Sequence, residues 1–400
     1  MKSAIAITSE IDDIQQCIDE LTQQISTGLQ YSKKSFGILF CDADIDVAAL
    51  SGGLHEKMGL EILGLTTTAT VERHSGYNGM GAVLCILTGD DIDFAIGVTG
   101  DLDASDYAGR IHEAYALARG KLSDDPKLIF LLAPYCHDLT SDNYSNELDL
   151  VSGGVPVFGG VATDHYDMQY QKTFLSGTSY ERGIVFLLLG GNIHPVFAME
   201  QDFSDAIGRK GVVAKSDGNQ VYRVGEQSFK GFLASFGPVP ADSDVIYFYQ
   251  STPFVLELPD NAEDEQPTVR ALLSIDHDTE AGGFLSHIPE KTSISLHMFK
   301  KENIFTSCDK TFEALTGRMR KNLDYNYSLL LIASCNARHL LMGDDKNIEA
   351  RIITEKLRDF PASLNALGFY GLGEICPTRL NSAGRAKGRF HNYSIVVCAI

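Results

Sequence analysis

The chain has 400 residues, of which 44% are hydrophobic and 22% are charged, and its formal net charge is −20. This length exceeds what one hydrophobic core usually serves, so we expect two domains. The acidic balance disfavours nucleic acid as a partner, because like charges repel. The longest apolar runs, such as Ile184–Leu189, are strand-length and fall short of the ~20 residues that cross a bilayer. The short apolar start is not typical of a secretory signal. We therefore expect a cytoplasmic protein without a membrane partner.

A strand, a helix-length segment and a second strand close to a glycine recur three times along the chain. The three instances are Phe36–Cys41 with Leu60–Leu65, Leu128–Leu132 with Val155–Gly160, and Leu329–Ser334 with Leu367–Gly373. Connections of this length favour parallel pairing of the two strands through a right-handed crossover. The sequence therefore predicts one strand–helix–strand unit that occurs three times.

Each unit is followed by apolar segments that suit antiparallel pairing. These segments are Ala82–Leu87 with Phe94–Val98, Gly183–Leu189 with His194–Met199, and Tyr393–Ala399. Because antiparallel strands would then join parallel pairs, we predict an α/β fold whose mixed β-sheets are flanked by helices.

Three further segments have the signals of helices. Residues 11–25 carry apolar side chains at helical spacing, and Ser9 is the expected N-cap. Residues 103–119 are followed by a glycine, and residues 346–360 are followed by a proline, which are typical of helix ends.

The character of the chain changes after residue 205. The segment Val212–Val224 has Gly218 near its middle and is predicted to form a β-hairpin. Residues 1–200 carry 28 acidic and 11 basic residues, whereas residues 201–400 carry 25 and 22. We therefore predict two α/β domains, over residues 1–205 and 206–400.

Common metal and nucleotide motifs do not explain the polar residues. Asp42 and Asp44 alternate as in an EF-hand loop, but Val47 and Gly53 stand where that loop needs glycine and glutamate. Capping of the next helix is the preferred explanation. Neither glycine-rich nucleotide motif is present, and no two of the eight cysteines form a C-x-x-C pair. No metal site is predicted.

The densest group of polar residues follows the strands of the third unit. Its members are Cys335, Arg338, Gly373, Glu374, His391 and Asn392. In α/β sheets the carboxyl ends of parallel strands meet at the ligand crevice, so we expect these residues to line a small-ligand site. Arg338 is suited to gripping a ligand carboxylate with two hydrogen bonds, or to pairing with Glu374. Each residue also has a structural explanation, such as a buried ion pair or a packed thiol.

An enzymatic alternative uses the same residues. Cys335 would be the nucleophile and His391 the base of a thiol-dependent hydrolase, with Glu374 as the orienting carboxylate. Nothing in the sequence fixes that geometry, so a binding protein is preferred over an enzyme.

Three of these C-terminal segments resemble a known family. The segments Leu330–Arg338 and Gly368–Pro377, followed by His391 and Asn392, are similar to the Cys-x-x-Arg strand, the Gly-Phe-Tyr-x-x-Gly-Glu-Ile-x-Pro segment and the closing His-Asn strand of FIST C domains. Arg270, Ile275 and Ile288–Glu290 resemble the middle of the same domain.

The N-terminal half resembles the FIST N domain more weakly. Phe36–Cys41 and Leu63–Thr70 stand where that family has a strand and a Gly-Cys-Ser-Thr-x-Gly-like turn. Leu65 replaces the usual small or thiol residue of that turn. The departure places ligand contacts by this turn in doubt.

The resemblance implies a sensory protein that binds a small ligand, such as an amino acid or a carboxylate. It also implies signalling through a separate partner, such as a histidine kinase or a cyclic-dinucleotide enzyme. Some stand-alone FIST proteins sense nitric oxide through haem, so haem is an alternative cofactor. Haem needs an axial ligand, usually histidine, and none of the eleven histidines is assigned to it.

Overall fold

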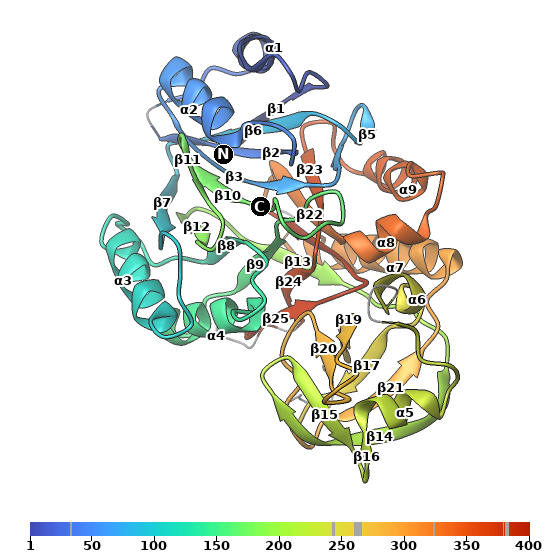
Figure 1. Ribbon diagram of the computed structural model, residues 1–400. Coiled ribbons are helices and arrows are strands. Elements are labelled where there is room, and N and C mark those ends of the chain that lie inside the picture. Colours follow the sequence, from blue (N-terminus) through green and yellow to red (C-terminus); the bar gives the residue numbers. More distant parts are fainter. Residues whose placement is uncertain (33, 242–244, 260–265, 323–324, 379, 381–383) are drawn as a thin grey trace.

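A computed structural model of the protein describes residues 1–32, 34–241, 245–259, 266–322, 325–378, 380 and 384–400. Three six-stranded sheets surround one apolar core, helices cover their outer faces, and a fourth sheet forms a separate lobe (Figure 1). The predicted α/β class with mixed sheets and flanking helices is confirmed.

The three sheets of the body have the same strand order. The first runs β1 (Lys2–Thr8), β6 (Ala82–Thr88), β2 (Ser35–Asp42), β3 (Glu61–Thr67), β10 (Thr173–Leu175), β11 (Thr178–Tyr180). The second runs β7 (Ile92–Val98), β12 (Val185–Gly191), β8 (Leu128–Ala133), β9 (Val157–Val161), β24 (Glu374–Pro377), β25 (Gly388–His391). The third runs β13 (Val196–Met199), β26 (Ile395–Ala399), β22 (Leu329–Cys335), β23 (Asn365–Gly371), β4 (Thr70–Glu72), β5 (Gly76–Asn78).

The predicted threefold repeat is confirmed at the centre of each sheet. β2 pairs with β3, β8 with β9, and β22 with β23, and all three pairs are parallel. These strands are continuous apolar runs because both of their faces are buried. In β2, for example, Phe36, Ile38 and Phe40 face the central core, whereas Leu39 and Cys41 pack under the helices.

The trailing strands are antiparallel, as expected, but the predicted partners are wrong. β6 pairs with β1 and β2 rather than with β7, and β7 pairs with β12 in the next sheet. In the same way β13 pairs with β26 rather than with β12. The reason is that β7 and β13 each begin the following unit, so each belongs to the sheet of that unit.

Each unit also gives a short hairpin to a neighbouring unit. The hairpin β4–β5 follows β3 but pairs with β23, β10–β11 follows β9 but pairs with β3, and β24–β25 follows β23 but pairs with β9. The exchange closes a ring of three units, so strands from both halves of the sequence share the second and third sheets.

Helices cover the outer face of every sheet. They are α1 (Ile14–Gly28) and α2 (Val47–Met58) on the first, α3 (Tyr107–Arg119) and α4 (Ser141–Ser152) on the second, and α7 (Lys301–Met319), α8 (Asn336–Leu341) and α9 (Ile348–Leu357) on the third. The three predicted helices are α1, α3 and α9. The N-cap of α1 is Asp13 rather than Ser9, and its carboxylate accepts the backbone N–H of Gln16.

The fourth sheet is an insertion into the third unit, between β13 and α7. It contains β14 (Ala206–Asp217), β15 (Gln220–Val224), β16 (Gln227–Ser228), β17 (Phe254–Glu257), β18 (Thr268–Arg270), β19 (Leu272–Ile275), β20 (Gly282–Phe284) and β21 (Ser293–His297), with helices α5 (Phe229–Ala234) and α6 (Val245–Tyr249). The predicted hairpin is β14–β15, and Gly218 takes a positive φ at its turn.

The predicted domain boundary at residue 205 falls where the chain leaves the three-unit body for this insertion. The division into 1–205 and 206–400 stays a prediction, because the two halves also share sheets. None of the described helices is long and apolar enough to span a membrane.

Candidate functional site

Arg338 lies in the first turn of α8 and is completely buried. Its Nε–H bonds to Glu349 Oε1 at 2.8 Å and its Nη1–H to Ser307 Oγ at 2.8 Å, while Nη2–H groups reach Glu349 and the Ile304 carbonyl. Every nitrogen of the guanidinium is therefore occupied. Arg338 is not free to grip a ligand carboxylate, and its ion-pair partner is Glu349 rather than the predicted Glu374.

Cys335, the last residue of β22, and Glu374, the first residue of β24, form a second buried pair. The Cys335 thiol lies beside the Glu374 carboxyl, and Glu374 Oε2 accepts the Ser394 hydroxyl at 2.6 Å. Burial raises the pKa of both groups well above their ordinary values. Both groups therefore hold their protons more tightly than exposed thiols and carboxyls do.

The other three predicted site residues, His391, Asn392 and Gly373, are buried next to this pair and away from any open surface. His391 lies opposite Glu374 in the β24–β25 ladder, and its Nε2 is 3.3 Å from the Cys376 carbonyl oxygen. Burial lowers the pKa of His391 to about 3, so the imidazole is neutral. Asn392 Oδ1 accepts the Ala271 N–H at 3.0 Å, which ties the insertion to the body. A side chain at Gly373 would collide with Phe390 and Asn392.

A cavity of about 280 Å³ lies in front of this cluster, between the body and the insertion. The body contributes the start of α8 and the segment after β9, and the insertion contributes α6 and β19. The lining residues are Tyr166, Asp167, Met168, Ile246, Tyr247, Gln250, Ala271, Leu272, Leu273, Leu285, Cys335, Asn336, Ala337, Leu340, Leu372 and Tyr393. Cys335 is thus the one predicted site residue that lines the cavity, while the other five stand behind its wall.

Asn336 is the cavity residue that the sequence reasoning missed. It begins α8 next to Cys335, is 3% exposed, and donates a long hydrogen bond of 3.4 Å to Thr163 Oγ1. Its Oδ1 has no hydrogen-bond partner among the described residues. A buried amide oxygen without a donor favours a ligand that supplies one. Its place directly after a predicted strand end was the available signal.

The segment after β9 forms one wall of the cavity and is held in a defined shape. The buried Asp164 carboxylate accepts the backbone N–H groups of Met168, Gln169 and Tyr170 at 2.8–2.9 Å. Tyr166 has a φ of 77°, which is rare for a residue with a side chain. Such strain persists only where the surroundings fix it, and it is common at ligand sites.

Tyr166 is also fixed through its side chain. Its hydroxyl is hydrogen-bonded to His339 Nδ1, while Tyr77 holds His339 Nε2 at 2.9 Å. Burial lowers the pKa of His339 to about 3, so this imidazole is neutral between the two tyrosines. The wall of the cavity is thus connected to the β4–β5 hairpin.

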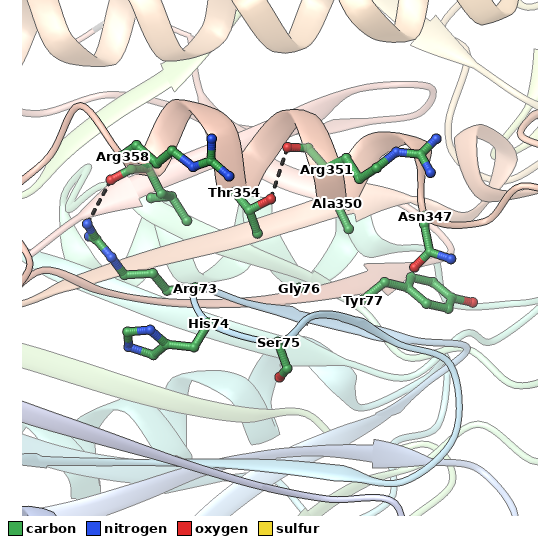
Figure 2. A pocket seen from close by; sticks show the side chains of 11 residues that line it. Arg73, His74, Ser75, Gly76, Tyr77, Asn347, Ala350, Arg351, Thr354 and Arg358 are labelled. Carbon is green, nitrogen blue, oxygen red and sulfur yellow. Dashed lines mark hydrogen bonds between the residues drawn. The ribbon is translucent and has the colours of Figure 1, made fainter.

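A second, more polar groove of about 400 Å³ lies between that hairpin and α9 (Figure 2). Three of its lining residues are arginines, and one of them, Arg73, donates from its guanidinium to the carbonyl oxygens of Leu357, Phe360, Pro361 and Leu364. These are carbonyls at and beyond the end of a helix, which lack internal donors. Arg73 therefore caps α9 and is not available to a ligand.

The contacts of Cys335 and His391 do not assemble a hydrolase. The hydrogen bond of His391 goes to a backbone carbonyl, and the Cys335 thiol has a raised pKa, whereas a nucleophilic cysteine needs a lowered one. Among the described residues that line the cavity there is no histidine, the usual axial ligand of haem.

An apolar cavity with one unsatisfied polar group, backed by a buried polar cluster, is typical of a small-ligand-binding protein. The FIST N domain matches residues 35–227 and the FIST C domain matches residues 239–377. The chain therefore belongs to the FIST family, whose domains are small-ligand sensors in signalling.

Other comparisons give only distant similarity. The crystal structure of a cyanuric acid hydrolase from A. caulinodans has 10% sequence identity and a TM-score of 0.38, and the match covers 100% of this chain and 98% of that chain. A second cyanuric acid hydrolase structure has 11% identity and a TM-score of 0.32, with 100% and 99% coverage. These similarities carry no information about the chemistry of this chain. No curated protein matches the sequence significantly.

Proposed function

We propose that this FIST protein is a cytoplasmic sensor that binds a small molecule in the cavity above Cys335 and Asn336, and that it signals through a separate protein such as a histidine kinase. The observation that carries the proposal is the unsatisfied Asn336 Oδ1 in the wall of an otherwise apolar cavity. A sensor needs a defined ligand site, and this cavity is a candidate for one.

The lining favours a small neutral molecule. Aliphatic and tyrosine side chains dominate it, and Asp167 is the one charged residue among the described lining residues. A carboxylate ligand would be repelled by Asp167 and would find no cation, since Arg338 is fully engaged by Glu349. A flat molecule that donates a hydrogen bond to Asn336 and packs against Tyr166 and Tyr247 is the best match.

The position of the cavity supports a mechanism by which ligand binding affects the surface of the protein. Its walls belong to two parts of the chain, the three-unit body and the insertion, which Tyr393 also connects through a 3.2 Å hydrogen bond to the Tyr249 carbonyl in α6. A ligand that contacts both parts would favour one arrangement of the insertion over others. The surface of the insertion is therefore our candidate for the contact with a signalling partner.

The test is a thermal-shift screen of neutral heterocycles and amides, followed by calorimetric titration of each hit. We expect one site per chain, and we expect Asn336→Leu to weaken binding at least tenfold, because it removes the acceptor and fills the cavity. The matched control is Asn347→Leu, an exposed asparagine outside the cavity, which should leave the affinity unchanged. Hits that bind equally well to Asn336→Leu would overturn the assignment of the site.

A further inference from the structure

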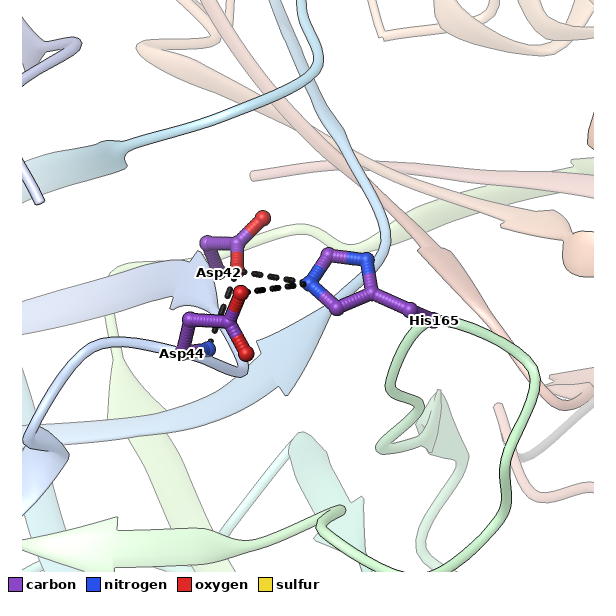
Figure 3. Close-up of side chains that lie close together, drawn as sticks. All are labelled: Asp42, Asp44 and His165. Atoms are coloured by element: carbon purple, nitrogen blue, oxygen red, sulfur yellow. Dashed lines mark hydrogen bonds and ion pairs between the residues drawn. The ribbon is translucent and has the colours of Figure 1, made fainter.

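Two acidic residues at the end of β2 meet a histidine from a distant segment. Asp42 is the last residue of β2, Asp44 follows in the next turn, and His165 lies after β9. Their side chains point toward one another (Figure 3). His165 Nε2 is 3.0 Å from Asp42 Oδ1 and 3.4 Å from Asp44 Oδ2. The three ligand atoms all lie within 4.8 Å of one another.

Asp42 is the unusual member of this group. Its side chain is 2% exposed, and it has no ion pair with a lysine or arginine in the described part of the chain. Its Oδ1 accepts the Asp44 N–H at 3.0 Å, but its Oδ2 is buried and accepts no hydrogen bond from any described residue. Buried carboxylates in proteins are normally paired with a cation or coordinate a metal. His165 supplies a positive charge only when it is protonated, so beside a neutral His165 the Asp42 carboxylate has no cationic partner among the described residues.

The spacing of the three groups suits a metal ion. Zinc bonds to imidazole nitrogen and carboxylate oxygen are about 2.0–2.2 Å long, which at tetrahedral or octahedral angles puts neighbouring ligand atoms about 2.8–3.6 Å apart. The distances of 3.0 Å and 3.4 Å from His165 Nε2 lie in this range. His165 and Asp44 are exposed, so water can complete the coordination.

We propose that Asp42, Asp44 and His165 bind one divalent transition-metal ion. Imidazole nitrogen together with carboxylate oxygen favours Zn²⁺ over Mg²⁺ or Ca²⁺, which prefer oxygen ligands alone. The ion offsets the buried charge of Asp42 and joins the first unit of the body to the second. The sequence drew attention to Asp42 and Asp44 but not to this site, because His165 lies 123 positions after Asp42 and only the fold brings the two together.

The site has a consequence for the ligand cavity, which rests on the function proposed above. His165 is directly followed by Tyr166, which lines the cavity and is hydrogen-bonded to His339. A metal ion that holds His165 would fix the backbone from which Tyr166 enters the cavity. Metal binding itself needs no cavity ligand, so the two proposals can fail separately.

The experiment uses the full chain after treatment with a chelator and dialysis. We expect calorimetry with Zn²⁺ to give one site per chain, and X-ray absorption at the zinc edge to give a nitrogen and oxygen shell near 2.0–2.1 Å with imidazole scattering. Competition from thiols is not expected, because all eight cysteines are buried. His165→Ala and Asp44→Asn should each weaken binding at least tenfold, and His165→Ala should remove the imidazole signal.

The matched control is His277→Ala. His277 is exposed and lies between Asp276 and Asp278, so it reproduces the local composition without a converging buried carboxylate. Its removal should leave the zinc affinity unchanged. Both test residues are exposed, so their variants should fold, which circular dichroism checks. Absence of a saturable zinc site, or equal affinity of His165→Ala and the unmodified chain, would overturn the proposal and leave an ordinary histidine–aspartate hydrogen bond.

Discussion

At the scale of single residues, Arg338 was predicted to bind a ligand carboxylate, but its contacts stabilise the fold instead. Arg338 and Glu349 are both fully buried, and Glu349 also accepts the Ser334 hydroxyl at 2.6 Å. A buried ion pair contributes little compared with an apolar pair of the same size, but removal of one partner leaves an isolated charge in the interior. The effect of a substitution thus depends on whether one or both partners are changed.

We expect Arg338→Met to lower the free energy of unfolding by about 3–5 kcal/mol, because Glu349 would remain buried without its partner. The double variant Arg338→Met, Glu349→Met should recover part of the loss. Urea titrations of the three proteins measure both quantities. Arg358→Met, at the exposed arginine directly after α9, is the control and should change stability by less than about 0.5 kcal/mol. Equal effects of Arg338→Met and Arg358→Met would contradict the structural role.

The buried carboxyl of Glu374 leads to a prediction about how the stability of the protein depends on pH. Burial raises the pKa of Glu374 well above its ordinary value, so the folded protein retains a proton that the unfolded chain releases above about pH 4.5. Stability from this group is therefore present at low pH and is lost as the pH rises from about 4.5 toward the folded pKa, with a limiting slope of about 1.4 kcal/mol per pH unit.

The variant Glu374→Gln cannot ionise but can still accept the Ser394 hydroxyl. We expect its stability relative to the unmodified chain to rise between pH 5 and pH 8, as measured by urea unfolding at each pH. The same substitution at exposed Glu313 is the control for the loss of one carboxylate. A constant difference for Glu374→Gln would show that Glu374 is ionised in the folded protein.

At the scale of elements, one glycine marks the same place in all three units. Gly64 of β3, Gly159 of β9 and Gly368 of β23 each pair with the hairpin that another unit contributes, opposite Phe174, Ile375 and Val71 respectively. A methyl group at Gly159 would overlap the carbonyl oxygen of Leu131 in the neighbouring strand. At Gly159 the absence of a side chain therefore permits the close approach of β9 to β8 within the same unit.

We expect Gly159→Ala to destabilise the protein by about 1–3 kcal/mol, because the added methyl group overlaps the Leu131 carbonyl oxygen and overpacks the contact between β9 and β8. Gly109→Ala in α3 is the control, since a methyl group there meets no atom within 4 Å. That change should stabilise the protein by roughly 0.5–1 kcal/mol, as alanine is the better helix former. Thermal unfolding of both variants measures the contrast, and a neutral Gly159→Ala would show that β8 and β9 can move apart at this point.

The same elements show what the sequence could and could not predict. The three parallel strand pairs follow from continuous apolar runs and from the length between them, which are local features. The pairing partners of β7, β13 and the three hairpins cannot be predicted from such local features, because each of these elements pairs with a strand that is distant in the sequence. The cavity was missed for the same reason, since its second wall comes from α6 and β19, whereas the predicted site residues were chosen from strand ends of one unit alone.

At the scale of the whole molecule, the ring of exchanged hairpins links regions that are far apart in the sequence. The Ser3 hydroxyl of the first strand donates to the Ser328 carbonyl, and the Ser328 hydroxyl donates to the Met1 carbonyl. Arg270 of the insertion reaches Asp142 and the Phe390 carbonyl in the body. No unit can therefore be removed without leaving unpaired strand edges in the others. The charge, by contrast, is spread unevenly over this connected body.

The net charge of −20 leads to a prediction about salt. Residues 1–200 hold 28 acidic and only 11 basic side chains, so repulsion among carboxylates opposes the compact state of the first two units. Salt shortens the reach of this repulsion to about 10 Å at 0.1 M ionic strength. The surface ion pairs, such as Lys57 with Asp19, are weakened by the same screening, but exposed pairs contribute at most about 1 kcal/mol each.

The repulsion between carboxylates should outweigh these ion pairs, so we expect Tm to rise between 20 and 300 mM sodium chloride. The rise should be about 1 °C for each kcal/mol gained in a chain of this size. Choline chloride at equal ionic strength should give the same rise, because screening does not depend on the cation. A rise with sodium alone would indicate a specific cation site, and a fall in Tm would show that the surface ion pairs outweigh the excess of negative charge.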